Sequence, residues 1–224
     1  MAKKAFAILP LGGSGVRFGS STPKQFLAFN GKPLFRYAFD ALAHSDLIST
    51  IVLPCLKGTA EEIAKSINGF DNGKDILFVK GGDTRFESVR NGVMALPDEG
   101  YVLICDGDRP FLNEDLIADC LSQAKLTGGA VAAIPSSDSL LQIGEAPHYV
   151  DRNSIMRVQT PQCFDLAKLK DAYAKADGRN YSDEGSLFMA AGYQLSASKG
   201  DIRNIKVDTP AHAALFFALG EKDE

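Results

Sequence analysis

The chain has 224 residues, of which 45% are hydrophobic and 23% are charged, and its formal net charge is −4. This length and composition are ordinary for one large globular domain, which we expect to span residues 1–224. Because a general nucleic-acid binder needs a basic face, the negative balance predicts no nucleic-acid partner.

The amino-terminal apolar run, "AFAILPL" at 5–11, is only seven residues long before two glycines. That is too short for a secretory or membrane segment, so we expect a buried strand and no membrane association. The four cysteines, Cys55, Cys105, Cys120 and Cys163, form no CxxC pair and no His/Cys cluster. Buried thiols are favoured over disulfides or zinc, which predicts a cytoplasmic location.

Helical and strand patterns then alternate as far as residue 136. We expect helices at 33–45, at 59–68 with a Thr59 cap, at 85–96, and at 113–126 with an Asn113 cap. Apolar runs at 50–55, 75–82 and 129–136 are typical of buried strands, and the stretch at 101–110 is a strand that runs into a loop. This alternation predicts a doubly wound α/β fold with a mostly parallel sheet covered on both faces.

Residues 135–164 break this rhythm, because they alternate polar and apolar residues around a "GEAP" turn. We interpret them as a protruding β-hairpin arm rather than another βα unit. Helices at 165–176 and 182–193, short strands at 193–200 and 203–208, and a closing helix that begins at Pro210 complete the expected domain.

Open sheets of this kind bind ligands at the carboxyl ends of their strands. The loops in question are Gly12–Lys24, Gly81–Arg85 and Asp106–Arg109. We therefore expect the chemistry of the protein in these three loops.

The first loop, "LGGSGVRFGSSTPKQF" at 11–26, is tested against three phosphate-binding templates. The Walker A template fails because no glycine is followed by Lys and then Ser or Thr. The dinucleotide template G-x-G-x-x-G is nearly met, with its third glycine one place late. The third template is a triphosphate loop, in which glycines let backbone N–H groups approach phosphates and the cations Arg17 and Lys24 supply charge. A glycine-rich turn with two solvated cations is the remaining alternative.

Five stretches in order resemble one family: "PLGGSGVRFGSSTPKQF", "GGDTRFESVRNG", "CDGDRPF", "VDRNSIMRVQTPQCF" and "NIKVDTP". Together they are similar to the 2-C-methyl-D-erythritol 4-phosphate cytidylyltransferases, within the sugar- and polyol-phosphate nucleotidyltransferases. The resemblance implies a Rossmann-like nucleotidyltransferase fold and transfer of a cytidylyl group from CTP to a polyol phosphate, with release of pyrophosphate. It places this reaction in isoprenoid precursor biosynthesis by the non-mevalonate pathway.

The resemblance also implies a role for individual residues. Arg17 and Lys24 stabilise the transition state, and the nucleotide is bound by Gly12, Gly13, Gly15, Gly82, Asp83, Ser88 and Asp106. Arg152, Thr160 and Lys206 bind the acceptor phosphate, the Arg–Thr segment coming from the arm of a second subunit in a homodimer. Mg²⁺, the expected cofactor, is held by Asp106, with Asp208 as a second carboxylate.

Three departures from the family pattern leave the acceptor open. The first loop has Leu11-Gly12-Gly13, Asp108 adds a negative charge in "CDGDRP", and Arg203 stands where an acidic residue is usual. Ribitol 5-phosphate or another polyol phosphate is the alternative acceptor, and a non-catalytic nucleotide- or NAD(P)-binding protein is the alternative from another class. Arg109 is either catalytic or paired structurally to an aspartate.

Overall fold

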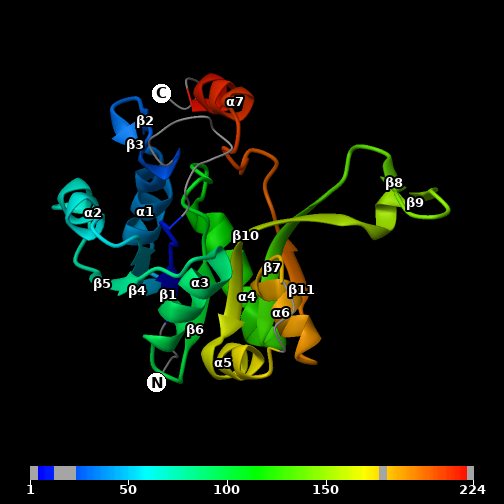
Figure 1. The fold of residues 1–224 in the computed structure, drawn as a ribbon, viewed down its shortest axis with the longest axis horizontal. Helices are drawn as coiled ribbons and strands as arrows, with labels where there is room; N and C mark the ends of the chain where they lie inside the picture. Colours follow the sequence, from blue (N-terminus) through cyan, green and yellow to red (C-terminus); the bar gives the residue numbers. More distant parts are fainter. Residues whose placement is uncertain (1–4, 13–23, 177–180, 221–224) are drawn as a thin grey trace.

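A computed structural model of the chain, which describes residues 5–12, 24–176 and 181–220, contains one seven-stranded central sheet (Figure 1). Its strand order is β11-β7-β10-β6-β1-β4-β5. The strands are β1 (Ala5–Ile8), β4 (Ile48–Cys55), β5 (Asp75–Lys80), β6 (Tyr101–Ile104), β7 (Gly129–Pro135), β10 (Met156–Asp165) and β11 (Ser196–Lys199). Only the two pairings made by β10 are antiparallel in this sheet, which confirms the predicted mostly parallel fold.

The central strands are buried on both faces of the sheet, as expected from their continuous apolar runs. In β1, Ala5 and Ala7 pack on one face, and Phe6 and Ile8 pack on the other. The first face is covered by α1 (Leu34–His44), α2 (Ala60–Ile67) and α4 (Glu114–Thr127), and the second by α3 (Arg85–Met94), α5 (Leu166–Ala174) and α6 (Glu184–Ala190). This is the doubly wound arrangement that the sequence predicts.

The antiparallel strand β10 is irregular just before the residues that pair with β6. Its register against β7 shifts between Val158 and Gln162, so three residues of β10 face a single residue of β7. Irregularities of this kind re-aim a side chain. Here Thr160 turns toward the loop that follows β6, and its hydroxyl accepts the backbone N–H of Asp106 at 3.0 Å.

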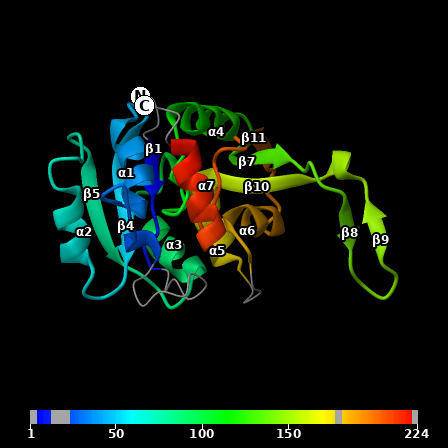
Figure 2. The same cartoon turned by 90° about the horizontal axis from the view of Figure 1, so that it is seen from above.

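A narrow arm protrudes from the sheet between β7 and β10 (Figures 1 and 2). It contains the antiparallel pair β8 (Leu140–Gln142) and β9 (His148–Val150), followed by the 3-10 turn η3 (Arg152–Ser154). The prediction of a hairpin arm is confirmed, but its carboxyl boundary at 164 was wrong. Residues from Met156 onward belong to the central sheet, because β10 pairs with β6 and β7.

Two further local predictions were wrong. Residues 203–208, all of them described, form no strand, although backbone bonds such as Val207 N–H to the Asp108 carbonyl hold this segment against the site. Thr59 does not cap α2 with its side chain; its hydroxyl instead donates to the Leu56 carbonyl at 2.9 Å.

The closing helix α7 (Pro210–Gly220) lies beyond the end of the sheet, outside the two helical layers (Figure 1). Phe216 packs edge-on against Phe29 and Tyr37, next to the small hairpin of β2 (Ala28–Phe29) and β3 (Lys32–Pro33). None of the helices in the described part of the chain is long and apolar enough to span a bilayer. All four cysteines are buried and unbridged, as predicted.

Candidate active site

The carboxyl ends of the parallel strands border a cleft of about 510 Å³. Its walls come from the loops after β1, β5 and β6 and from the segment before α7. The predicted site residues that line it are Gly12, Gly82, Asp83, Ser88, Asp106 and Lys206. Residues separated by up to nearly 200 positions in the sequence therefore share one cavity.

The loop after β1 enters the cleft at Gly12. A Cβ at Gly12 would lie 3.2 Å from the Ser88 hydroxyl oxygen, so a larger residue would press on the facing turn. Gln25, which is buried, donates to the Leu11 carbonyl at 2.9 Å and ties the far end of this loop to its start. Gly13, Gly15 and Arg17 lie outside the described residues. Lys24 begins the 3-10 turn η2 (Lys24–Phe26), and its side chain is also outside what the structure describes.

The turn between β5 and α3 is held by its own side chains. Glu87 and Thr84 form a reciprocal capping box, in which the Glu87 carboxylate accepts the N–H groups of Asp83 at 2.8 Å and Thr84 at 3.1 Å. The Ser88 hydroxyl accepts the Gly82 N–H at 3.0 Å and donates to the Thr84 carbonyl at 2.9 Å. Bonds within the turn therefore shape this wall, and the role of Gly82, Asp83 and Ser88 in nucleotide binding stays a prediction.

Asp106, directly after β6, is the most heavily paired carboxylate of the cleft. Lys206 Nζ lies 2.9 Å from Oδ2, Arg85 Nη2 lies 3.3 Å from Oδ1, and Arg109 Nε lies 3.5 Å from Oδ2. Burial alone would raise the pKa of Asp106, but these positive charges outweigh it and hold the pKa well below its usual range. Asp106 is consequently ionised at any ordinary pH.

Lys206 faces two carboxylates at once. Its ammonium group is 2.9 Å from Asp106 and 4.0 Å from Asp108, whose side chain is largely buried. Burial lowers the pKa of Lys206, yet the two aspartates more than reverse this and raise it. The extra negative charge of Asp108 is thus offset by a cation that the same cleft contains.

Of the two alternatives for Arg109, a catalytic role or a structural pair with an aspartate, the contacts of its side chain favour the structural pair. Its Nη1 donates to the Asn204 carbonyl at 2.7 Å, while its Nε faces Asp106. Asn204 is itself fully buried and donates through Nδ2 to the Thr160 carbonyl at 2.8 Å. Thr160, which is 5% exposed, lies behind Asp106 in the same chain, so its expected placement on the arm of a partner is wrong.

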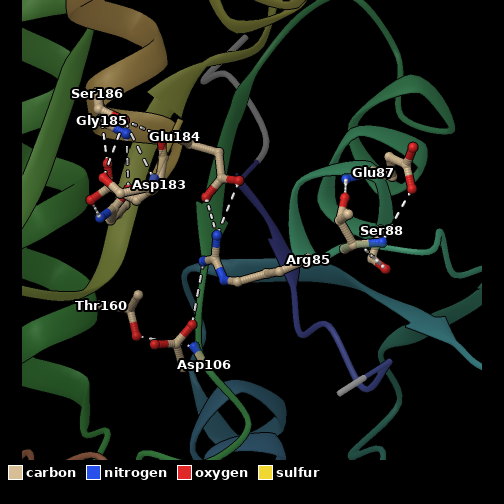
Figure 3. A network of polar contacts seen from close by, with 12 residues as sticks. Arg85, Glu87, Ser88, Asp106, Thr160, Asp183, Glu184, Gly185 and Ser186 are labelled. Carbon is tan, nitrogen blue, oxygen red and sulfur yellow. Dashed lines mark hydrogen bonds and ion pairs between the residues drawn. The ribbon is translucent and has the colours of Figure 1, made fainter. Parts of the chain in front are cut away.

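Sequence reasoning missed the pair Arg85–Glu184, which Figure 3 shows beside Asp106. Arg85 Nη1 donates to both oxygens of Glu184, at 3.2 and 2.9 Å, while Nη2 of the same guanidinium donates to Asp106. The partners of Arg85 are 99 and 21 residues away in the sequence, so no local spacing could have indicated them.

Besides Thr160, two predicted site residues lie away from the described wall of the cleft. Arg152 is on the arm, where it is exposed and donates to the Ser137 carbonyl at 3.1 Å. The Asp208 N–H faces His212 Nδ1 at 3.3 Å, and Asp208 is not among the described residues that border the cavity. Its assignment to a metal stays a prediction.

Comparison with known proteins gives one consistent result. Residues 5–219 match the family model for 2-C-methyl-D-erythritol 4-phosphate cytidylyltransferase. A protein of that name from Thermosipho africanus is 36% identical, over 90% of this chain and 92% of its own length. One from Halalkalibacterium halodurans is 34% identical, over 96% of this chain and 97% of its own length.

Solved structures agree with the sequence relatives. The crystal structure of 2-C-methyl-D-erythritol 4-phosphate cytidylyltransferase from Thermus thermophilus superposes with a TM-score of 0.80 at 29% identity, covering 99% of this chain and 100% of that one. The 4-diphosphocytidyl-2C-methyl-D-erythritol synthase from Anaerococcus prevotii superposes with a TM-score of 0.86 at 25% identity, covering 98% and 99%.

Proposed function

Because the chain belongs to the 2-C-methyl-D-erythritol 4-phosphate cytidylyltransferase family, we propose that it transfers the cytidylyl group of CTP to 2-C-methyl-D-erythritol 4-phosphate. The products are the CDP-polyol and pyrophosphate. The observation that carries this proposal is the cleft in which Gly12, the β5–α3 turn and the Asp106–Lys206 pair meet. A glycine wall at one side and a cluster of cations at the other suit a nucleotide and a phosphorylated acceptor.

In this reaction a phosphate oxygen of the acceptor attacks the α-phosphorus of CTP. A new P–O bond forms as the bond from the α-phosphorus to the bridging oxygen breaks, and that oxygen leaves with pyrophosphate. Negative charge builds up on the transferred group and on the leaving group, so fixed positive charges lower the barrier. We assign this role to Arg17 and Lys24 on the first loop, as the sequence predicts, and we assign Lys206 to the acceptor phosphate.

The cleft also has the donors that a magnesium ion prefers. Asp106 and Asp108 border it with carboxylate oxygens, and Mg²⁺ in nucleotide sites takes one or two protein carboxylates together with phosphate and water oxygens. We propose that Asp106 holds Mg²⁺, with Asp108 or the predicted Asp208 as the second carboxylate. When bound, the ion would neutralise phosphate charge and orient the triphosphate.

We further propose that the chain acts as a homodimer joined through its arm. The arm has no core of its own and exposes large apolar side chains, among them Ile143 at 76% and Tyr149 at 77%. Exposed apolar groups on an isolated hairpin favour a partner surface. In such a dimer Arg152 on the arm would reach the partner's cleft and bind the acceptor phosphate there.

The cytoplasmic location expected from the sequence stays a proposal, supported by the four unbridged thiols.

Methylerythritol phosphate is favoured over ribitol 5-phosphate as the acceptor. Arg203, the departure that suggested a different polyol, pairs with Asp201 at 3.4 Å and is not among the described residues that border the cleft. The experiment measures the release of pyrophosphate from CTP, in the presence of Mg²⁺, with each member of a panel of polyol phosphates. Release with ribitol phosphate alone would replace the acceptor, and no release with any member would refute the proposed reaction.

A further inference from the structure

Glu184 is a fully buried carboxylate that the reaction described above does not use. It is the first residue of α6, and its side chain has no exposed surface. Burial raises its pKa, although the neighbouring charge of Arg85 opposes that shift. Both carboxylate oxygens face Arg85, and the Tyr173 hydroxyl donates to one of them at 3.4 Å. A buried carboxylate of this kind is tolerated as an ion only through its partner.

That partner, Arg85, connects the buried carboxylate to the cleft. A third of the Arg85 side chain is exposed, and the residue borders the cavity. One side of its guanidinium is occupied by Glu184, and the other donates to Asp106 at 3.3 Å (Figure 3). A continuous path of charged contacts therefore runs from α6 through α3 to the loop after β6.

This geometry restricts what Arg85 can do when an anion enters the cleft. If Arg85 turned toward a bound triphosphate, it would leave Glu184 charged and unpaired in the interior, which is strongly unfavourable. Arg85 therefore stays in the wall of the cleft, where it contacts the carboxylate that faces the substrates. Without Glu184, the long side chain of Arg85 would be free to adopt other rotamers and to turn toward the nearest anion.

We propose that Glu184 is a positioning residue for the transfer reaction: it holds Arg85 in the cleft wall and, through Arg85, fixes the orientation of Asp106 toward the substrates. This inference rests on the proposed function for its kinetic consequences. Glu184 itself does not touch the cleft, so every effect of changing it must pass through Arg85.

The test is a double-mutant cycle of Glu184→Gln, Arg85→Gln and the double variant. Each is measured by kcat/KM for pyrophosphate release and by the Kd of CTP from calorimetry. We expect Glu184→Gln to lower kcat/KM by about 10- to 100-fold, the range found for groups that orient a metal-binding side chain. Because both residues act through one contact, the double variant should be no slower than Arg85→Gln, within about twofold.

Glu114→Gln is the matched control, since Glu114 is also the first residue of its helix, α4, but is exposed. It should retain the wild-type kcat/KM and CTP affinity. A double variant whose loss equals the product of the two single losses would overturn the inference, as would wild-type kinetics in Glu184→Gln.

If Glu184→Gln does not fold, the comparison of Arg85→Gln with the double variant decides alone. Equal kcat/KM values support the inference, and a further loss in the double variant overturns it. If the wild type releases no pyrophosphate with any acceptor, the proposed function fails, and the same cycle measured on CTP affinity still tests whether Glu184 acts through Arg85.

Discussion

Replacing Gly82 by alanine should disrupt the cleft wall that follows β5. A Cβ at position 82 would lie 2.2 Å from the Cβ of Glu87, where ordinary contact begins at 3.4 Å. The Glu87 Cβ is attached directly to the backbone of α3 and cannot rotate away, so the turn and the helix must separate by about an ångström. That movement breaks the bonds from Asp83 and Thr84 N–H to the Glu87 carboxylate.

The expected cost has two parts. Overpacking of a tight site costs about 1–3 kcal/mol, and loss of a helix cap costs about 0.5–2 kcal/mol. We therefore expect Gly82→Ala to lower the free energy of unfolding by roughly 2–4 kcal/mol, which in a domain of this size lowers Tm by about 5–15 °C. CTP binding should weaken in the variant, because Gly82, Asp83 and Ser88 border the same cleft.

Urea unfolding and calorimetric titration with CTP measure the two effects. Gly144→Ala on the arm is the control, since a Cβ there meets nothing within 4 Å and its backbone needs no left-handed conformation. The control should stay within about 0.5 kcal/mol of the wild type. If Gly82→Ala were equally neutral in both assays, the packing of the turn against Glu87 described above would be refuted.

Four further changes test other parts of the site and the arm. Lys206→Met removes the closest cation from Asp106, and we expect kcat/KM for the acceptor to fall by about 10²-fold, the scale of losing one charged donor at a reaction site; an unchanged value would contradict its assignment to the acceptor phosphate. Thr160→Val leaves the buried Asp106 N–H without its acceptor, which should cost about 1–3 kcal/mol in urea unfolding, while Thr160→Ser should stay close to wild type. The pKa of Asp106 is lower in the folded chain than in the unfolded chain, so its contribution to stability is complete above the unfolded value of about 4 and is lost as the pH falls toward the folded value; Asp106→Asn should make the dependence of unfolding free energy on pH shallower below about pH 4, and an unchanged slope would contradict the shift. Tyr149→Asp places a charge on the exposed apolar arm, and sedimentation should show a shift from dimer to monomer if the arm forms the interface.

Local pattern was sufficient where a segment's environment follows from its own residues. The run at 5–11 is apolar at successive positions because β1 is covered on both faces. The helix at 113–126 begins where Asn113 can cap it, and its side chain accepts the Leu116 N–H at 3.0 Å. The order of strands and helices likewise predicted that the loops after the parallel strands meet at the carboxyl edge of the sheet.

Local pattern failed where a competing hydrogen bond decides the environment of a side chain. The alternating polar residues of β10 indicated an exposed arm, yet Gln162 is 2% exposed because it bonds to Asp183 and to the Gly185 N–H. Thr59 is of a residue type that often caps helices, but its hydroxyl donates instead to a carbonyl of the preceding turn. In both cases the alternation of polar and apolar residues does not reveal the competing hydrogen bond.

By itself the sequence determined the fold class, the edge of the sheet at which the cleft lies, and six of the residues that border it. The fold class and the edge of the sheet follow from periodicity and turns, which act over a few residues, and the individual site residues follow from the resemblance of five stretches to one family. Only the tertiary structure decided that Asp106 pairs with Arg85 and Lys206. It also decided that the Thr160 hydroxyl accepts the backbone N–H of Asp106, and that Glu184 neutralises Arg85. Charged and buried polar groups depend on which strands become neighbours, and the placement of β10 between β6 and β7 brings these partners together.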